Sequence, residues 1–294
     1  LGSDAWRELR RRPLFIASLV LILLFVVMAA FPQLFTSVDP TYADLNRNLQ
    51  PPKWENWFKF GVDGQFGYDI LGRDVYARTI YGARASIIVG LVTVLGTTVL
   101  GGFVGLVAGY FGGWLDSLMS RFADIFLGVP LVLGSLLILS TFASRAHDNP
   151  SAFKIASLVI IALVALGWPV FARIMRSSVI STKQLDYVAA ARALGARPSR
   201  IIFRHVLPNA VAPLIVVATI SIGSYIGAEA TLSFLGVGLQ DPVVSWGVMI
   251  SGGITYREVA PHMMLFPGAF LTIAVLSFVM LGDAVRDALD PKLR

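Results

Sequence analysis

Residues 181–209 read STKQLDYVAAARALGARPSRIIFRHVLPN and form a polar island between two strongly apolar runs. Ser181 and Gln184 have the spacing of a capping box, which predicts that a short helix begins at Ser181. Four residues after them recur at the i, i+3, i+4 and i+7 positions of a single helical face: Tyr187, Ala190, Ala191 and Leu194. Gly195 then stands where helices commonly end in a left-handed residue. The pattern predicts a short amphipathic helix closed by a glycine turn.

A second short helix is expected directly after this turn. Pro198 suits the first turn of a helix, where no amide hydrogen is needed. Pro208 disfavours helical geometry in the residue before it, so the second helix is predicted to end near Leu207. The small side chains of Ala190 and Ala191 would allow another surface to approach the first helix closely.

The composition indicates a membrane protein. Of the 294 residues, 56% are hydrophobic and only 14% are charged, whereas about a quarter of the residues in a soluble domain are charged. The apolar residues form uninterrupted runs near the roughly 20 residues that a helix needs to cross a bilayer. We therefore predict an all-α, polytopic membrane protein.

Six transmembrane helices are predicted, and they define the organisation of the chain. They lie at residues 14–31, 85–108, about 118–142, 155–174, 210–230 and 265–282. The first run is longer than the ~7–15 apolar residues of a signal peptide, so we interpret it as a retained helix. Residues 1–13 form an N-terminal segment, 32–84 a mixed segment between the first two spans, and 85–294 a five-helix core. A loop or re-entrant turn is expected over 231–264.

The positive charge supports one orientation of these spans. A net charge of +6 could indicate binding to nucleic acid, but the basic residues lie beside the apolar runs, as in membrane proteins. With both termini in the cytoplasm, cytoplasmic segments carry 15 Lys and Arg residues and outer segments carry 9. We therefore predict cytoplasmic N- and C-termini, a cytoplasmic 181–209 segment, an extracytoplasmic 32–84 segment, and no nucleic-acid partner.

Glycines recur every fourth residue within two of the predicted spans, at Gly101, Gly105 and Gly109 and at Gly223 and Gly227. Such strips let helix backbones approach closely in lipid, so we predict that these residues pack against neighbouring helices. A flexible hinge is the alternative for the first three. Arg121 and Asp124 lie one turn apart and are expected to pair, although a proton relay is the alternative for charges in a span.

Motifs that carry catalysis are missing. The sequence has no G-x-x-x-x-G-K-[ST] phosphate loop, no HExxH zinc motif and no G-x-S-x-G nucleophile elbow. Its three histidines are scattered over different loops and it has no cysteine, so neither a metal site nor a disulfide is predicted. No catalytic residue is predicted, and no substrate-binding residue can be assigned.

Residues 181–209 also resemble a known element. The pattern Ala190-Ala191, Gly195 and Leu207-Pro208 resembles the EAA loop of ABC-importer permeases, the cytoplasmic segment that docks onto the ATPase subunit. Residues 186–209, 71–74 and 81–84 are similar to the C subunit of dipeptide and oligopeptide permeases. The sequence departs from the pattern at Ala189, where glutamate is usual, and at His205, where the wider family has isoleucine.

This resemblance implies a type I ABC-importer permease fold in the bacterial inner membrane. It implies a heterodimer with a homologous permease, two cytoplasmic ABC ATPase domains and an extracytoplasmic solute-binding protein. ATP and magnesium would be bound by the ATPase subunits, so this chain would need no cofactor and would not be an enzyme itself. The docking residues that the resemblance implies are Asp186, Tyr187, Ala190, Ala191, Leu194, Gly195, Leu207 and Pro208.

The implied substrates are di- or oligopeptides, with nickel chelates or glutathione as the alternatives within the same family. A secondary transporter coupled to ions would be expected to carry ionisable residues or broken helices near the middle of the membrane. The charges of this sequence cluster at the ends of the spans instead, which favours the ABC permease.

Overall fold

The computed structural model describes residues 12–57, 59, 62–143 and 151–289. Within these ranges the regular structure is helical, apart from one isolated antiparallel bridge between Tyr68 and Asp74. The all-α prediction is therefore confirmed for the part of the chain that is described.

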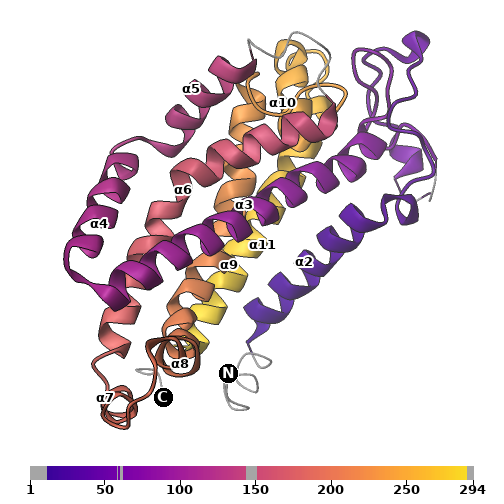
Figure 1. Cartoon of the computed structure of the whole chain (residues 1–294). Helices are drawn as coiled ribbons and strands as arrows, with labels where there is room; N and C mark the ends of the chain where they lie inside the picture. The colour runs from indigo at the N-terminus through magenta and orange to yellow at the C-terminus, as the bar shows by residue number, and fades with distance from the viewer. Residues whose placement is uncertain (1–11, 58, 60–61, 144–150, 290–294) are drawn as a thin grey trace.

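Five helices in the described residues are long and apolar enough to cross a membrane. They are α2 (Pro13–Ala30), α3 (Val75–Phe111), α6 (Ala152–Thr182), α9 (Leu207–Phe234) and α11 (His262–Leu289). Figure 1 shows them side by side in one bundle, with the start of α2 and the end of α11 at the same end as two short helices, α7 (Asp186–Ala193) and α8 (Pro198–Ile201). We call this the α7 end of the bundle. The opposite end carries residues 32–74 and α10 (Trp246–Gly253), and we call it the α10 end.

The sixth candidate span is broken. Residues expected to form a continuous helix over 118–142 form α4 (Gly113–Leu127) and α5 (Leu131–Ala143), whose axes are bent by 82°. Gly128 and Pro130 lie in the break. Proline cannot donate a backbone hydrogen bond, whereas its carbonyl can still accept one, here from the Gly134 N–H at 2.8 Å. The prediction of one continuous third span was wrong.

Helix α3 begins well before residue 85, where the sequence placed its start. The Asp74 side chain caps it by accepting a hydrogen bond from the Ala77 N–H at 2.6 Å. Arg78, which the sequence assigned to an extracytoplasmic loop, is a buried helical residue with Asp69 at 3.7 Å and Asp241 at 3.6 Å. Because distant carboxylates neutralise this arginine, the helix extends through a segment that looks too polar for it.

The Leu71–Asp74 stretch, for which the sequence offered no role, shapes the start of α3. Gly72 has φ +69°, and a Cβ atom there would stand 1.8 Å from the Asp44 carbonyl oxygen. Arg73 pairs with Asp69 at 2.7 Å, and Asp74 also accepts the Gly64 N–H at 2.5 Å. Burial raises the pKa of Asp74, while the hydrogen bonds that it accepts from the Ala77 and Gly64 N–H groups favour its ionised form. The stretch therefore has a structural role.

Glycines of α3 lie against α6 without intervening side chains. A Cβ atom on Gly101, Gly105 or Gly109 would stand 2.4, 2.3 or 2.9 Å from a carbonyl oxygen of α6. Gly223 of α9 lies similarly against α11, 2.8 Å from the Val275 carbonyl oxygen. Gly227 differs, because a Cβ atom there would meet nothing within 4 Å in the described structure, so no neighbouring helix of this chain packs against it.

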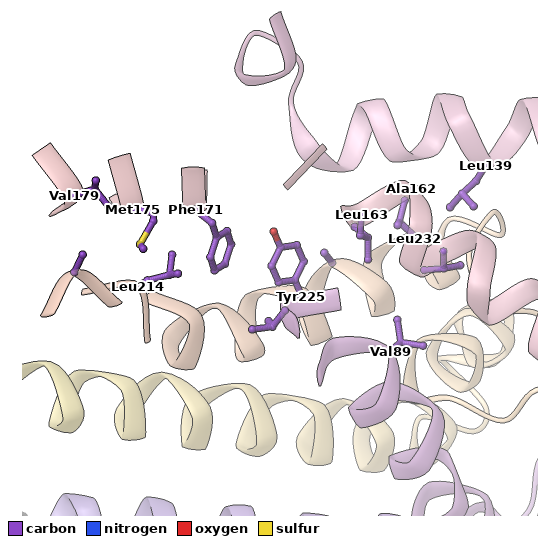
Figure 2. Close-up of a cluster of buried hydrophobic side chains, with 14 of the residues drawn as sticks. Val89, Leu139, Ala162, Leu163, Phe171, Met175, Val179, Leu214, Tyr225 and Leu232 are labelled. Carbon is purple, nitrogen blue, oxygen red and sulfur yellow. The ribbon is translucent and has the colours of Figure 1, made fainter. Parts of the chain in front are cut away.

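The main core lies between α6 and α9 and continues into α3 and α5. Figure 2 shows Phe171 and Met175 of α6 on the side that faces Leu214 and Tyr225 of α9. The same cluster extends toward the α7 end, where it takes in three buried residues of the 181–209 segment: Val188, Ile201 and Val206. The polar island is therefore built onto the end of the membrane core.

At the α10 end, the predicted loop or re-entrant turn over 231–264 contains the short helix α10. Ser245 caps it by accepting the Val248 N–H at 3.3 Å. Trp246 is fully buried, and its indole N–H donates to the Thr79 carbonyl of α3 at 2.9 Å. Beside it, the fully buried Glu229 of α9 accepts a hydrogen bond from Ser233 at 2.8 Å. The Trp246–Thr79 contact holds α10 against α3, and the Ser251 hydroxyl, which donates to the Phe234 carbonyl at 3.0 Å, holds it against α9.

Candidate functional site

The first helix of the 181–209 segment begins later than the sequence indicated. Ser181 lies in the last turn of α6, and its hydroxyl donates to the Ser177 carbonyl at 3.1 Å. Helix α7 starts only at Asp186, and Leu185 before it provides no side-chain cap. The predicted capping box was therefore wrong, because α6 continues to Thr182, whose side chain is buried against the bundle.

The end of α7 is the predicted glycine turn. Gly195 has φ +75°. Its N–H donates to the Arg192 carbonyl at 3.0 Å, and the Ala196 N–H donates to the Ala191 carbonyl at 3.1 Å. This pair of bonds is a Schellman motif, in which a left-handed residue lets the chain satisfy the last carbonyls of a helix. Nothing lies within 4 Å of a Cβ position on Gly195, so backbone conformation alone demands glycine here.

The chain then returns to the membrane through α8 and a wider turn. Pro198 occupies the first turn of α8, as predicted. A π-helical turn, Ile202–Val206, follows, in which the Leu207 N–H donates to the Ile202 carbonyl. The helix does not end near Leu207, so that prediction was wrong. Pro208 lies in the first turn of α9, and the wider π turn directly before it relieves the crowding that a proline ring causes in an α-helix.

The predicted face of α7 is exposed and lines a shallow depression of about 690 Å³. Leu194 has 87% of its surface exposed and Tyr187 has 41%. The Tyr187 and His205 rings lie 6.3 Å apart between centroids. The lining residues are Tyr187, Ala190, Ala191, Leu194, Gly195, Ala196, Arg197, Arg200 and His205. The structure thus brings together five of the sequence-predicted site residues, whereas Asp186, Leu207 and Pro208 do not line the depression.

Three buried residues hold the depression in place, and the sequence analysis had not singled them out. Val188 lies beside the exposed face of α7 and is 0% exposed, while Ile201 and Val206 are 2% and 0% exposed. All three belong to the main core cluster together with Val179 of α6. β-Branched apolar residues inside an otherwise polar segment are the signal that could have identified these anchors. We call Val188, Ile201 and Val206 the anchor residues.

The rim of the depression is basic. Arg197 and Arg200 line it, and Arg192 and Arg204 are exposed nearby. Asp186 lies in the first turn of α7, where a carboxylate is favoured by the helix dipole. The surface therefore has an apolar centre of alanine, leucine and tyrosine with arginines around it, which suits a groove with an acidic edge.

Ion pairs and a lysine tie this end of α6 to its neighbours. Lys183 donates to the Gly109 carbonyl at the end of α3 at 2.6 Å, where a cation also complements the helix dipole. Arg176 binds both carboxylate oxygens of Asp116 on α4, at 2.5 and 2.6 Å. The expected pair of Arg121 with Asp124 was wrong, since Asp124 pairs with Arg173 of α6 at 2.7 Å.

The described residues contain no group of three or more His, Cys, Asp or Glu side chains that could hold a metal ion.

Two family descriptions match the sequence. Residues 101–294 match the binding-protein-dependent transport system inner membrane component, which is more than half of the chain. The chain belongs to this permease family. Residues 1–52 of the permease additionally match the N-terminal TM domain of oligopeptide transport permease C.

Characterised relatives match the permease over almost its whole length. The dipeptide transport system permease protein DppC of Alkalihalophilus pseudofirmus is 40% identical over 291 residues, which cover 99% of this chain and 90% of the relative. The oligopeptide transport system permease protein OppC of Bacillus subtilis is 36% identical, and its alignment covers 100% of this chain and 90% of the relative. The glutathione transport system permease protein GsiD of Pectobacterium atrosepticum is 34% identical, and its alignment covers 99% of this chain and 91% of the relative.

Among solved structures, a chain of the MetNI methionine ABC transporter in an inward-facing conformation is similar, with a TM-score of 0.58 and 20% identity. The match covers 72% of the permease and 97% of that chain. At this identity the similarity shows the fold, which is that of a type I ABC-importer permease.

These findings confirm the main predictions from sequence. The permease is a multi-pass inner-membrane protein and the transmembrane subunit of a binding-protein-dependent ABC importer. It works with ATPase and substrate-binding partners, and the ATPase activity lies in partner subunits.

Proposed function

We propose that the permease takes up di- or oligopeptides that an extracytoplasmic solute-binding protein delivers. Support comes from the printed functions of two relatives, a dipeptide and an oligopeptide permease, each aligned over at least 99% of this chain. Uptake of glutathione is the second candidate, because a glutathione permease is 34% identical over a similar length. Glutathione is itself a small peptide, so both candidates require recognition of a short, charged peptide backbone.

The permease acts in this proposal as one half of a heterodimer with a homologous permease, above two cytoplasmic ATPase domains. Nucleotide and magnesium are bound entirely by those domains. The bundle is oriented with the α7 end, and hence both termini, in the cytoplasm. The charge asymmetry of the sequence supports this orientation, since Lys and Arg flank the spans mainly at that end.

The observation that carries the coupling role is the exposed depression on α7 and α8, held on three buried anchor residues. An isolated exposed loop could move without affecting the spans. The segment that forms the depression is continuous with the core between α6 and α9, so a partner bound to it would displace those helices. ATP binding would close the ATPase domains, and the docked segment would transmit that closure to the membrane.

Paired arginine substitutions on α7 test the docking. Ala191 lines the depression, while Ala193 is exposed on the same helix and does not line it. In the reconstituted transporter, Ala191→Arg is expected to abolish ATPase copurification and peptide uptake, and Ala193→Arg to preserve both. Wild-type uptake in the Ala191→Arg transporter would show that the depression is not the docking surface.

Competition separates the two substrate candidates. Uptake of a labelled dipeptide into vesicles that contain the complete transporter is expected to fall when unlabelled di- or tripeptides are added. If glutathione inhibits this uptake and other peptides do not, the second candidate is favoured. Ligand eluted from the copurified binding protein, identified by mass spectrometry, gives an independent answer.

A further inference from the structure

Helix α4 is joined to the rest of the bundle by two non-helical connections. Gly112, which separates it from α3, and Gly113, its first residue, both have positive φ (69° and 62°). Beyond its chain neighbours no atom lies within 4 Å of a Cβ position on Gly113, and the Lys183 ammonium lies 4.0 Å from the corresponding position on Gly112. At the other end, the Gly128–Pro130 break turns the chain by 82° into α5. Helix α4 is thus a straight segment between two points at which the backbone can pivot.

Helix α4 packs on α3 and α6 through one small cluster, in which Ala123 and Phe126 contact Val104 and Trp168, and spaces remain beside it. Ala123 is the buried residue of this helix. An apolar space of about 450 Å³ lies among α4, α3 and α6 beside these contacts, and a second space of about 230 Å³ reaches the charged end of α6. The first is lined by Leu100, Val104, Leu118, Met119, Phe122 and Trp168. Because close-packed interiors resist displacement, a helix that stands over two such spaces has room to shift.

The side-chain contacts that hold α4 converge on α6. Arg176 binds both oxygens of Asp116, and Arg173 binds Asp124 at 2.7 Å. Two phenylalanines of α4, Phe122 and Phe126, lie against Trp168 of α6 with ring centroids 6.0 and 5.8 Å away. A movement of α6 would therefore be passed to α4 through these contacts.

Helix α6 is also the element that leads into the depression. It ends at Thr182, four residues before α7 begins, and its Val179 packs in the same cluster as the anchor residue Val188. We propose that α4 is a lever moved by α6, and that the Arg176–Asp116 contact positions it, so that a displacement of the docked α7 reaches the broken span α4–α5. This inference rests on the proposed docking of the ATPase to α7 and α8.

The geometry of the Arg176–Asp116 contact suits this positioning role. A bidentate arginine–carboxylate pair fixes direction as well as distance. The Asp116 side chain is 18% exposed and that of Arg176 is 37% exposed, whereas Arg173 and Asp124 are 63% and 49% exposed. Exposed ion pairs contribute little to stability. The less exposed Arg176–Asp116 pair, rather than the Arg173–Asp124 pair, is therefore the one expected to fix α4 relative to α6.

A charge exchange tests the contact in the complete transporter reconstituted with its ATPases and binding protein. Arg176→Asp and Asp116→Arg are each expected to lower the amount of dipeptide transported per ATP hydrolysed by roughly tenfold, within the usual range for coupled sites. The double variant, with both charges exchanged, is expected to recover most of the wild-type ratio. Arg121→Asp is the matched control, because Arg121 is an exposed arginine of α4 outside this contact, and it should leave the ratio unchanged.

A distance measurement separates a lever from a merely structural contact. Spin labels at Phe103→Cys on α3 and Ser117→Cys on α4, both exposed positions, report the separation of the two helices. The distance is expected to differ between the nucleotide-free and ATP-trapped transporter, and this difference should vanish in Arg176→Asp. If a variant assembles poorly, Arg176→Lys keeps the charge without the bidentate geometry and should give an intermediate distance change and transport ratio.

The outcomes distinguish this inference from the docking on which it rests. Wild-type retention of the ATPases by the Ala191→Arg permease would overturn the docking. Retention of the ATPases with the same α3–α4 distance in both nucleotide states would overturn the lever alone. Absence of recovery in the double variant, with both single variants assembled, would also overturn it.

Discussion

Gly105 of α3 lies so close to Ala172 of α6 that a Cβ atom on Gly105 would stand 2.3 Å from the Ala172 carbonyl oxygen. Gly101 and Gly109 repeat this approach one turn away on either side, against Trp168 and Arg176. In lipid, where apolar side chains gain little by leaving the solvent, such backbone proximity is a main source of helix association. The contact also holds α6, and with it the depression, against α3.

Substitution of Gly105 should therefore weaken the bundle. Gly105→Ala is expected to lower the free energy of unfolding by about 1–3 kcal/mol, as in other overpacked sites, and Gly105→Leu to lower it further. Thermal unfolding of the purified complex and its yield measure the effect. Gly227→Ala is the control, because a Cβ atom there meets open space and should cause no loss. Unchanged stability of Gly105→Leu would contradict close packing of α3 on α6.

Gly195 should tolerate only residues that adopt its left-handed conformation. The conformation costs roughly 1–2 kcal/mol for L-residues other than glycine, and asparagine adopts it more readily than most. Gly195→Val is expected to leave the spans inserted but to abolish copurification of the ATPases, while Gly195→Asn should retain it. Membrane yield and pull-down of the ATPase measure both properties. Equal retention by the two variants would mean that the Schellman turn is dispensable for docking.

Asp74 should contribute more to stability than its place in a polar segment suggests. Asp74→Ala removes the cap of α3, worth about 0.5–2 kcal/mol, and leaves the Gly64 N–H without its partner, at about 1–3 kcal/mol. Thermal unfolding is expected to show a clearly larger loss of stability for Asp74→Ala than for Asp39→Ala. Asp39 is a suitable comparison because it is an exposed aspartate of the same segment whose side chain accepts hydrogen bonds from the nearby Thr41. Similar losses for both variants would contradict the assigned role.

Cysteine labelling can establish the orientation of the bundle, since the natural chain has no cysteine. Ser199→Cys, on exposed α8, is expected to react with an impermeant maleimide only from the cytoplasmic side. Glu55→Cys, exposed at the α10 end, is expected to react only from the opposite side. Reaction of the Ser199→Cys variant in intact cells would reverse the proposed topology.

Features set by neighbouring residues were predictable from the sequence. The common face of Tyr187, Ala190, Ala191 and Leu194 follows from helical periodicity, and the turn at Gly195 follows from the freedom of glycine at positive φ. The long apolar runs likewise predicted the spans, because their length is dictated by the thickness of the bilayer.

Features that depend on distant partners were not predictable in the same way. Arg78 suggested a loop because its partner Asp241 lies more than 160 residues away. Asp124 has an arginine one turn away on its own helix, yet pairs with Arg173 of another helix. Ser181 matched a capping pattern, but tertiary packing extended α6 past it. The break at Gly128 and Pro130 is the exception, since both residue types disfavour a continuous helix and could have indicated it.

Helix α3 is far longer than a bilayer requires. Its 37 residues correspond to about 55 Å of α-helix, whereas the hydrocarbon layer is about 30 Å thick. Arg78 and Arg84 lie in its first three turns, so the surplus projects at the end that carries residues 32–74. Because Thr79 and its neighbours in these turns are buried against α10, the surplus is a braced extension that sets the distance of that segment from the lipid. Deletion of helical turns from this part of α3 would consequently bring residues 32–74 closer to the membrane surface.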